Sequence, residues 1–158
     1  MEPETDILIR LAQPQDLETL GLMTVRFWVN EELYRHGIGI NNLNVIQTLR
    51  ALLENGQGVI VVAEKEGILI GFIAGVITPW CANYQQRIVQ ELIWWVNPED
   101  RGTRAAYQMM NKYEEEARNQ GCHFSIMGTH DAPNEERLIQ FYESCGFRHL
   151  QYQMIKEI

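Results

Sequence analysis

The chain has 158 residues, a length typical of one domain, and 46% of them are hydrophobic, the usual share for a globular protein. Thirteen Lys and Arg residues stand against twenty-one Asp and Glu residues, which gives a formal net charge of −8 at pH 7. This balance argues against a nucleic-acid binder with a broad basic face, because duplex affinity comes mainly from neutralised phosphates, and against a polybasic membrane anchor. Solubility and a preference for a cationic partner both account for an acidic balance.

Cysteine usage and the N-terminal sequence indicate a cytoplasmic protein without a metal site. The cysteines at positions 81, 122 and 145 form no CxxC pair, and no Cys/His spacing resembles a zinc site. Three scattered cysteines are too few for a disulfide framework. The N-terminus lacks an apolar signal core, and the longest apolar run ends near Pro79 after about 12 residues, too few to span a bilayer. We therefore expect a single domain over residues 1–158.

The N-terminal two thirds of the chain predict one strand, two helices and then three strands. In chain order these are a strand at 7–11, a helix from Pro14 to about Arg35, a helix capped by Asn44 and stopped by Asn55-Gly56, and strands at 59–63, 68–77 and 88–96. Residues 64–67 form a turn, so the strands on either side of it pair as a hairpin. Residues 79–86, which include Trp80 and Tyr84, are expected to form an irregular loop.

Beyond Pro98 the pattern alternates between helices and strands. The expected elements are a helix at 103–120, a strand at 123–127, a helix at 133–145, and one long or two short strands over 147–158. This order predicts a mixed α+β sheet domain. The strand-helix-strand unit over 88–127 is expected to form a right-handed parallel crossover.

The segment from Glu91 to Ala106 carries the most chemical information, because a buried strand runs through a short polar turn directly into a helix. Unpaired N–H groups and the macrodipole at such a helix start favour a phosphate or pyrophosphate. Arg101 and Arg104 add positive charge. A ligand can approach the backbone at three small residues, Gly102, Ala105 and Ala106. An ordinary capped turn with solvated arginines has the same spacing, so both interpretations stay open.

Two motifs resemble the GNAT superfamily of N-acetyltransferases. The run Arg101 to Ala106 (RGTRAA) is similar to the signature Arg/Gln-x-x-Gly-x-Gly/Ala, except that Arg104 replaces the middle glycine; members from bacteriophages have a similar turn. The run Phe141 to Phe147 (FYESCGF) resembles the family segment (Leu/Phe)-Tyr-Glu-x-x-Gly-Phe. The order of elements matches the family over nearly the full length. The family asparagine seven residues before the tyrosine falls at Glu135 here, so its contact is not carried over.

The resemblance implies a mostly antiparallel central sheet with helices on both faces, acetyl-CoA as donor and a primary amine as acceptor. The pyrophosphate would lie on the backbone beside Arg101, at Gly102, Thr103, Arg104, Ala105 and Ala106. The pantetheine arm would pair with the splayed, bulged strand at Trp94, Trp95 and Val96. Neighbouring strand residues point to opposite faces, so one tryptophan is expected to point inward and the other toward the cleft; burial of both in a two-sided core is the alternative.

The resemblance also names catalytic candidates. Tyr142 matches the family tyrosine beside the CoA sulfur and would act as the general acid, whereas packing of an ordinary helix aromatic is the alternative. Glu91 is the candidate base, directly or through water, because a lone carboxylate in an apolar strand has a raised pKa. A solvent-exposed Glu at the strand start is the competing interpretation. The Val96 N–H is the expected oxyanion donor, and His130 is a second candidate for proton handling.

The acceptor is expected between 29–42, 79–86 and 128–134. The candidate binding residues there are Glu31, Tyr34, Trp80, Tyr84, His130 and Asp131. Acidic and aromatic side chains suit a cationic amine, although surface Glu residues are also commonly just solvated.

The leading hypothesis from the sequence is an acetyl-CoA-dependent N-acetyltransferase. A non-catalytic acyl-CoA-binding or regulatory module with the same fold is the alternative, and an interaction protein that uses the fold as a scaffold is the third. No nucleic-acid or membrane partner is expected, and the sequence is compatible with a homodimer.

Overall fold

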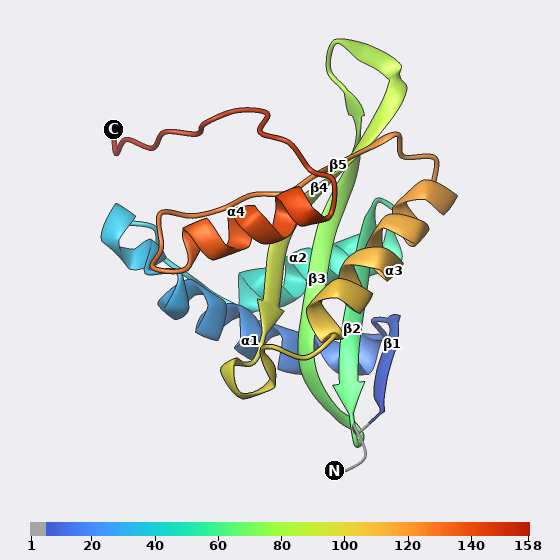
Figure 1. Cartoon of the computed structure of the whole chain (residues 1–158), viewed down its shortest axis with the longest axis vertical. Coiled ribbons are helices and arrows are strands. Elements are labelled where there is room, and N and C mark those ends of the chain that lie inside the picture. The colour runs from blue at the N-terminus through green and yellow to red at the C-terminus, as the bar shows by residue number, and fades with distance from the viewer. Residues whose placement is uncertain (1–5) are drawn as a thin grey trace.

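The strands lie side by side in the same order as they occur along the chain, β1-β2-β3-β4-β5 (Figure 1). The computed structural model describes residues 6–158. The strands are β1 (Ile7–Leu11), β2 (Gly58–Lys65), β3 (Ile68–Trp80), β4 (Asn83–Val96) and β5 (Phe124–Ile126). The first four pair antiparallel, whereas β4 and β5 run parallel. The predicted mixed sheet with one parallel pair is therefore confirmed.

Helices cover both faces of this sheet (Figure 1). They are α1 (Leu17–Asn30), α2 (Asn42–Glu54), α3 (Ala105–Asn119) and α4 (Glu135–Ser144), with short 3-10 helices at Pro14–Asp16, Leu33–His36 and Pro98–Asp100. No helix within residues 6–158 is both long and apolar enough to cross a membrane.

Neighbouring residues of the central strands point to two separate cores, because successive side chains on a strand face opposite ways. Ile60 and Phe72 pack with α1 and α2 in one core. Val61 and Ile73 pack with α3 in the other, around Tyr113, which is fully buried. This two-sided burial explains why β2 and β3 consist of nearly continuous apolar runs.

Besides shifts of one or two residues at the ends of α3 and α4 and a 3-10 turn at Pro14–Asp16, two helix boundaries differ from the sequence-based prediction. The first helix ends at Asn30, and residues 33–36 form a separate 3-10 turn. The cap of α2 is Asn41 rather than Asn44, because the N–H of Asn44 donates to the side-chain oxygen of Asn41 at 3.2 Å. Two asparagines three residues apart both suit a cap by composition, and only the backbone geometry distinguishes them.

The expected irregular loop at 79–86 is wrong. β3 continues to Trp80 and β4 begins at Asn83, so this region is the end of a long hairpin that extends beyond the helices (Figure 1). Polar residues can extend a hairpin because the ladder is built from backbone hydrogen bonds, which do not depend on apolar side chains.

The expected strand or strands over 147–158 are also wrong. The chain turns at Gly146, where φ is 89°, and the segment then crosses above α4 without regular secondary structure (Figure 1). Its apolar side chains, such as Leu150, Tyr152 and Met154, are exposed. Their alternation with polar residues resembles a strand in the sequence, but a strand also needs a paired neighbour.

Candidate active site

The site begins where β4 separates from β5. The two strands pair only from Ile88 to Gln90 on β4, and a register shift next to Gly75 leaves Leu92 as an extra, bulged residue. Beyond this point the strands diverge, and a cleft of about 320 Å³ opens between β4, the start of α3 and α4. The cleft is lined by Phe27, Glu31, Glu91, Trp94, Trp95, Val96, Asp100, Arg101, Gly102, Thr103, Ala106, Gly128, His130, Asn134, Arg137, Leu138, Phe141 and Tyr142.

The ladder between β3 and β4 leaves backbone groups of β4 facing this cleft. The N–H of Asn97 donates to the carbonyl oxygen of Ile70 at 2.8 Å. Hydrogen-bonded pairs alternate along an antiparallel ladder, so the next pair, Gly71 with Val96, is not hydrogen-bonded. The backbone groups of Val96, and by the same alternation those of Trp94, therefore point away from β3. An extended ligand in the cleft can pair with them.

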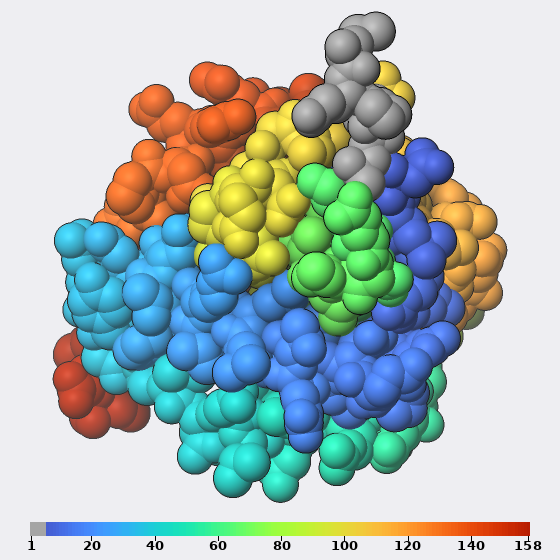
Figure 2. Space-filling view, turned by 90° about the horizontal axis from the view of Figure 1, so that it is seen from below, coloured from blue at the N-terminus to red at the C-terminus, as the bar shows by residue number. Residues whose placement is uncertain are grey.

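The turn after β4 brings the start of α3 to the same cleft. In Figure 2 the turn lies between the N-terminal helix, the α4 region and the β2–β3 turn. Gly102 has φ of 85°, a conformation that favours glycine, whereas Arg104 has φ of −74°, which any residue adopts. Gly102, Thr103 and Ala106 line the cleft, but Arg104 and Ala105 do not. Ala105 is fully buried, and its N–H donates to the Thr103 hydroxyl at 3.3 Å.

The two neighbouring tryptophans point to opposite sides of β4. Trp95 is 3% exposed and packs in the core with α1. The guanidinium carbons of Arg26 and Arg101 lie 5.6 Å and 4.8 Å from the centroid of its ring. Trp94 stacks on Tyr142 with ring centroids 5.8 Å apart. The Trp94 indole N–H is buried and has no acceptor among residues 6–158. Both side chains also contribute to the cleft wall.

Glu91 and Tyr142 meet at the backbone of Gly128. The Tyr142 hydroxyl donates to the Gly128 carbonyl oxygen at 3.0 Å, and the Gly128 N–H donates to the Glu91 carboxylate at 3.1 Å. Burial raises the pKa of Glu91 to about 7, the Gly128 N–H opposes this rise, and the charge of Glu31 adds to it. Burial likewise raises the pKa of Tyr142, with a further contribution from Glu91, so the phenol stays protonated at neutral pH.

Glu31 and His130 also line the cleft, and the charge of Glu31 acts on both Glu91 and Tyr142. Glu31 follows the last turn of α1 and is 8% exposed. Its carboxylate lies 4.0 Å from Nδ1 of His130, whose ring forms a T-shaped pair with Phe27 at a centroid distance of 5.6 Å. With Glu91 nearby, this part of the cleft holds two carboxylates and suits a positively charged group.

The remaining predicted acceptor residues do not line this cleft. Tyr34 is half exposed and packs on Trp28, and Asp131 is exposed. Trp80 lies beside a second groove formed with β5 and residues 145–150, and Tyr84 is 80% exposed on the β3–β4 hairpin. The structure thus brings together Glu31 and His130 only.

Sequence reasoning missed the contribution of α4 apart from Tyr142. Asn134, Arg137, Leu138 and Phe141 line the cleft, in addition to Phe27 and Asp100 from other elements. Residues 134, 138, 141 and 142 share one helix face by their spacing, and Arg137 lies beside that face. Counting back from Tyr142 in helical steps of three and four residues would have predicted that these residues face the cleft.

The sequence matches the family model described as Acetyltransferase (GNAT) family over residues 41–147, more than half of the chain. This chain belongs to the GNAT family. Among curated protein sequences, none matches it significantly. The family match confirms the resemblance of the two motifs and the predicted enzyme class of acyltransferase.

Solved structures share the fold of this GNAT protein at low sequence identity. A predicted acetyltransferase from Clostridium acetobutylicum, solved with acetyl-CoA, is 19% identical with a TM-score of 0.76, and 96% of each chain is covered. The aminoglycoside N-acetyltransferase AAC(6′)-Iy, solved with CoA, is 16% identical with a TM-score of 0.78, covering 100% of this chain and 98% of that chain. A ribosomal-protein-alanine N-acetyltransferase from Brucella melitensis biovar Abortus 2308 is 14% identical with a TM-score of 0.72, covering 97% and 99%. The predicted donor is thus the ligand of one structure with this fold.

Proposed function

We propose that this GNAT protein transfers the acetyl group of acetyl-CoA to a primary amine by direct attack. The main support is that a candidate base, Glu91, and a candidate acid, Tyr142, are both hydrogen-bonded to the backbone of Gly128. All three residues line the cleft, which ends at the start of α3. The cleft therefore has proton-handling groups at one end and free backbone N–H groups at the other.

The donor fits the cleft in an extended pose. The pyrophosphate would lie against the start of α3, near the N–H groups of Gly102, Thr103 and Ala106. The pantetheine arm would pair with the backbone groups of Trp94 and Val96 that face away from β3. This pose directs the thioester toward Tyr142 and Glu91.

The reaction needs the amine to lose a proton, because an alkylammonium group titrates near 10.4. Glu91 would take this proton, directly or through one water, and the neutral amine would then attack the thioester carbonyl carbon. In this pose Val96 is paired with the pantetheine arm, so a cleft-facing backbone N–H of β4 on the Glu91 side of that pairing, rather than that of Val96, would stabilise the oxyanion of the tetrahedral intermediate. As the intermediate collapses, the C–S bond breaks and the sulfur takes a proton from Tyr142. The second amine proton of the intermediate then passes to the Tyr142 phenolate, which restores the phenol, and Glu91 releases its proton to solvent. Burial disfavours a free thiolate and so favours proton transfer to the sulfur, whereas the raised pKa of Tyr142 opposes the loss of its proton.

A cationic acceptor is supported by the carboxylates of Glu31 and Glu91, which both line the cleft. An ammonium group between them would offset their mutual repulsion. AAC(6′)-Iy has also been solved with a bisubstrate analog that joins CoA to acetylneamine, so this fold accommodates an amine acceptor in that protein.

The non-catalytic alternative rests on Arg104 in place of the motif glycine and on the undetermined identity of the base. The φ of −74° at Arg104 requires no glycine, so this departure does not disturb the turn. The test is thiol release from acetyl-CoA with a panel of polyamines, amino acids, aminoglycosides and peptides. Turnover with an amine supports the proposed enzyme, whereas tight binding of acetyl-CoA without turnover on any of them supports the binding module.

A further inference from the structure

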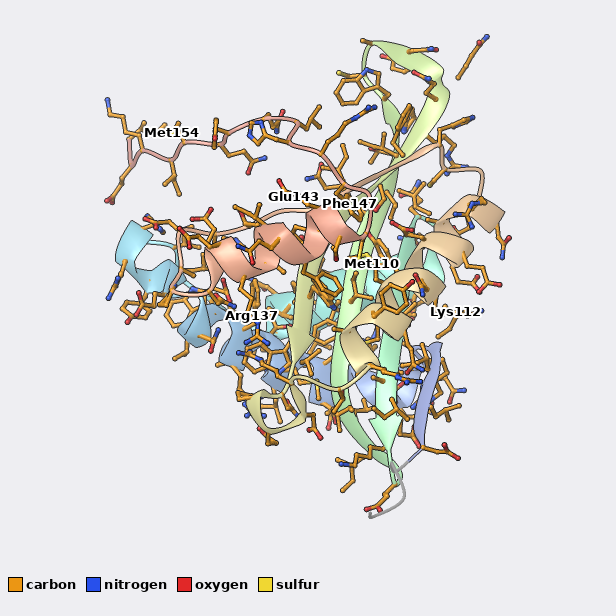
Figure 3. All side chains as sticks on the ribbon, in the orientation of Figure 1. Met110, Lys112, Arg137, Glu143, Phe147 and Met154 are labelled. Carbon is orange, nitrogen blue, oxygen red and sulfur yellow. The ribbon has the colours of Figure 1, made fainter. Side chains whose placement is uncertain are left out.

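The cleft contains a cation that the two family motifs do not include. Arg137 lies on α4 and lines the cleft together with Arg101, although the two are far apart in the sequence. In Figure 3, Arg137 lies below α4, between this helix and the turn that follows β4. Arg104, which the sequence places beside the phosphates, does not line the cleft.

The side chain of Arg101 is held against the cleft wall by contacts within the protein. Its Nε donates to the carbonyl oxygen of Val96 at 3.0 Å, and its guanidinium group lies over the ring of Trp95. Arg137 in contrast forms no ion pair and donates no hydrogen bond within the described part of the chain. Its five donors are therefore free to bind a ligand.

The charges around Arg137 favour an anion at this place. Burial lowers the pKa of Arg101; the charges of Glu31 and Glu99 raise it, and the positive charges of Arg26 and Arg137 lower it. Arg137 therefore lies close enough to Arg101 for the two guanidinium groups to repel each other. Of the cleft carboxylates near Arg101, Asp100 lies 3.8 Å from the ammonium group of Lys65, and Glu31 lies 4.0 Å from Nδ1 of His130. An anion between the start of α3 and α4 would relieve the repulsion between the arginines.

We propose that Arg137 is the second cation of the phosphate site and donates to the CoA pyrophosphate from the α4 side of the cleft. The start of α3 then holds one side of the pyrophosphate with backbone N–H groups, and α4 holds the other with a guanidinium fork. Arg137 thus occupies the role that the motif spacing assigned to Arg104. This inference rests on the proposed function, because it takes acetyl-CoA as the ligand.

The test is calorimetric affinity for three ligands that differ in phosphate content: acetyl-CoA, acetyl-dephospho-CoA, which lacks the 3′-phosphate, and S-acetylpantetheine, which lacks all phosphates. The variants are Arg137→Ala and Arg137→Lys, and the matched control is Arg104→Ala, which removes the same charge outside the cleft. Arg137 is exposed, so its replacement should leave the thermal unfolding midpoint unchanged.

We expect Arg137→Ala to lower the affinity for acetyl-CoA and for acetyl-dephospho-CoA about tenfold or more, because a charge-assisted hydrogen bond is lost. The affinity for S-acetylpantetheine should stay unchanged. Arg137→Lys should recover part of the loss, and Arg104→Ala should cost about twofold or less. Equal losses for Arg137→Ala and Arg104→Ala overturn the inference. The inference is also overturned if Arg137→Ala lowers the affinity for S-acetylpantetheine, or if it leaves the affinity for acetyl-dephospho-CoA unchanged. Absence of acetyl-CoA binding by the unaltered protein would instead overturn the proposed function, and this inference with it.

Discussion

Tyr142 and Glu91 are tied to one another through the backbone of Gly128, which accepts from the Tyr142 hydroxyl through its carbonyl and donates to the Glu91 carboxylate through its N–H. The two side chains come from α4 and β4, and Gly128 follows β5. The relative position of candidate acid and base therefore depends on one short segment after β5. A shift of this segment would move both groups together.

Replacement of Glu91 by Gln should remove the candidate base without changing its size. We expect turnover with a reactive amine to fall at least about a hundredfold, the usual contribution of a general base. In the unaltered enzyme, kcat/KM should fall as the pH drops below about 7, because burial raises the pKa of Glu91 to about 7 and a protonated carboxyl accepts no proton. The measurement is a pH profile of thiol release. An unchanged acidic limb in Glu91→Gln would show that another group titrates.

The same substitution should change the pH dependence of stability. Because the pKa of Glu91 rises from its ordinary 4.5 to about 7 on folding, the folded state binds more protons than the unfolded state between these values, and stability falls as the pH rises through this window. The cost is at most about 3 kcal/mol above pH 7. Denaturant unfolding should show that the free energy of unfolding of Glu91→Gln, relative to that of the unaltered protein, is higher at pH 8 than at pH 5. An equal difference at both pH values would contradict a raised pKa.

Tyr142→Phe removes the phenol hydroxyl and keeps the ring that packs on Trp94. Affinity for acetyl-CoA should be retained, whereas turnover should fall by about tenfold to a thousandfold as the leaving thiolate loses its proton donor. Calorimetry and thiol release measure the two effects separately. If turnover stays unchanged, Tyr142 has no part in the mechanism and only packs.

Arg104→Gly restores the glycine of the family motif. The structure predicts a small effect on acetyl-CoA affinity, about twofold or less, because Arg104 has an ordinary backbone conformation and does not line the cleft. Calorimetric titration with acetyl-CoA measures this directly. A loss of tenfold or more would show that the Arg104 side chain reaches the ligand.

Position 75 requires glycine, because the Tyr113 side chain packs against its backbone next to the β4 bulge. A Cβ at this position would lie 1.9 Å from the Tyr113 hydroxyl oxygen and 2.9 Å from the carbonyl oxygen of Gln90. Gly75→Ala should therefore destabilise the fold by about 2 kcal/mol or more, as overpacking of a core does. It should also lower activity, because Gly75 pairs with Glu91 across the ladder.

Gly39→Ala is the matched control for this substitution, because a Cβ at Gly39 would meet no atom of residues 6–158 within 4 Å. Its unfolding free energy should stay within about 0.5 kcal/mol of the unaltered protein. The double variant Gly75→Ala with Tyr113→Phe should recover part of the lost stability, because the closest clash disappears. If chemical denaturation shows no recovery of stability in the double variant, the destabilising clash is the one with the β4 backbone at Gln90 rather than the one with Tyr113.

Local pattern and composition determined much of this protein from sequence alone. Periodicity predicts the order of elements up to α4 and the strand-turn-helix segment around Arg101, because each is encoded by neighbouring residues. The two motifs indicate the family, and this resemblance names Glu91 and Tyr142 as catalytic candidates. The fold at the C-terminal segment did not follow, since alternation predicts a strand whether or not a partner strand is present.

Only the tertiary structure decided which side chains share the cleft. Glu31 and His130 meet there, whereas Trp80 and Tyr84 extend away on a hairpin, although all four fit a cationic acceptor by type. Arg137 reaches the cleft and Arg104 does not, because the direction of a side chain at a helix start depends on how that helix packs. Spacing along the chain specifies a residue's neighbours in sequence, and packing across β4, α3 and α4 specifies which of them face one ligand.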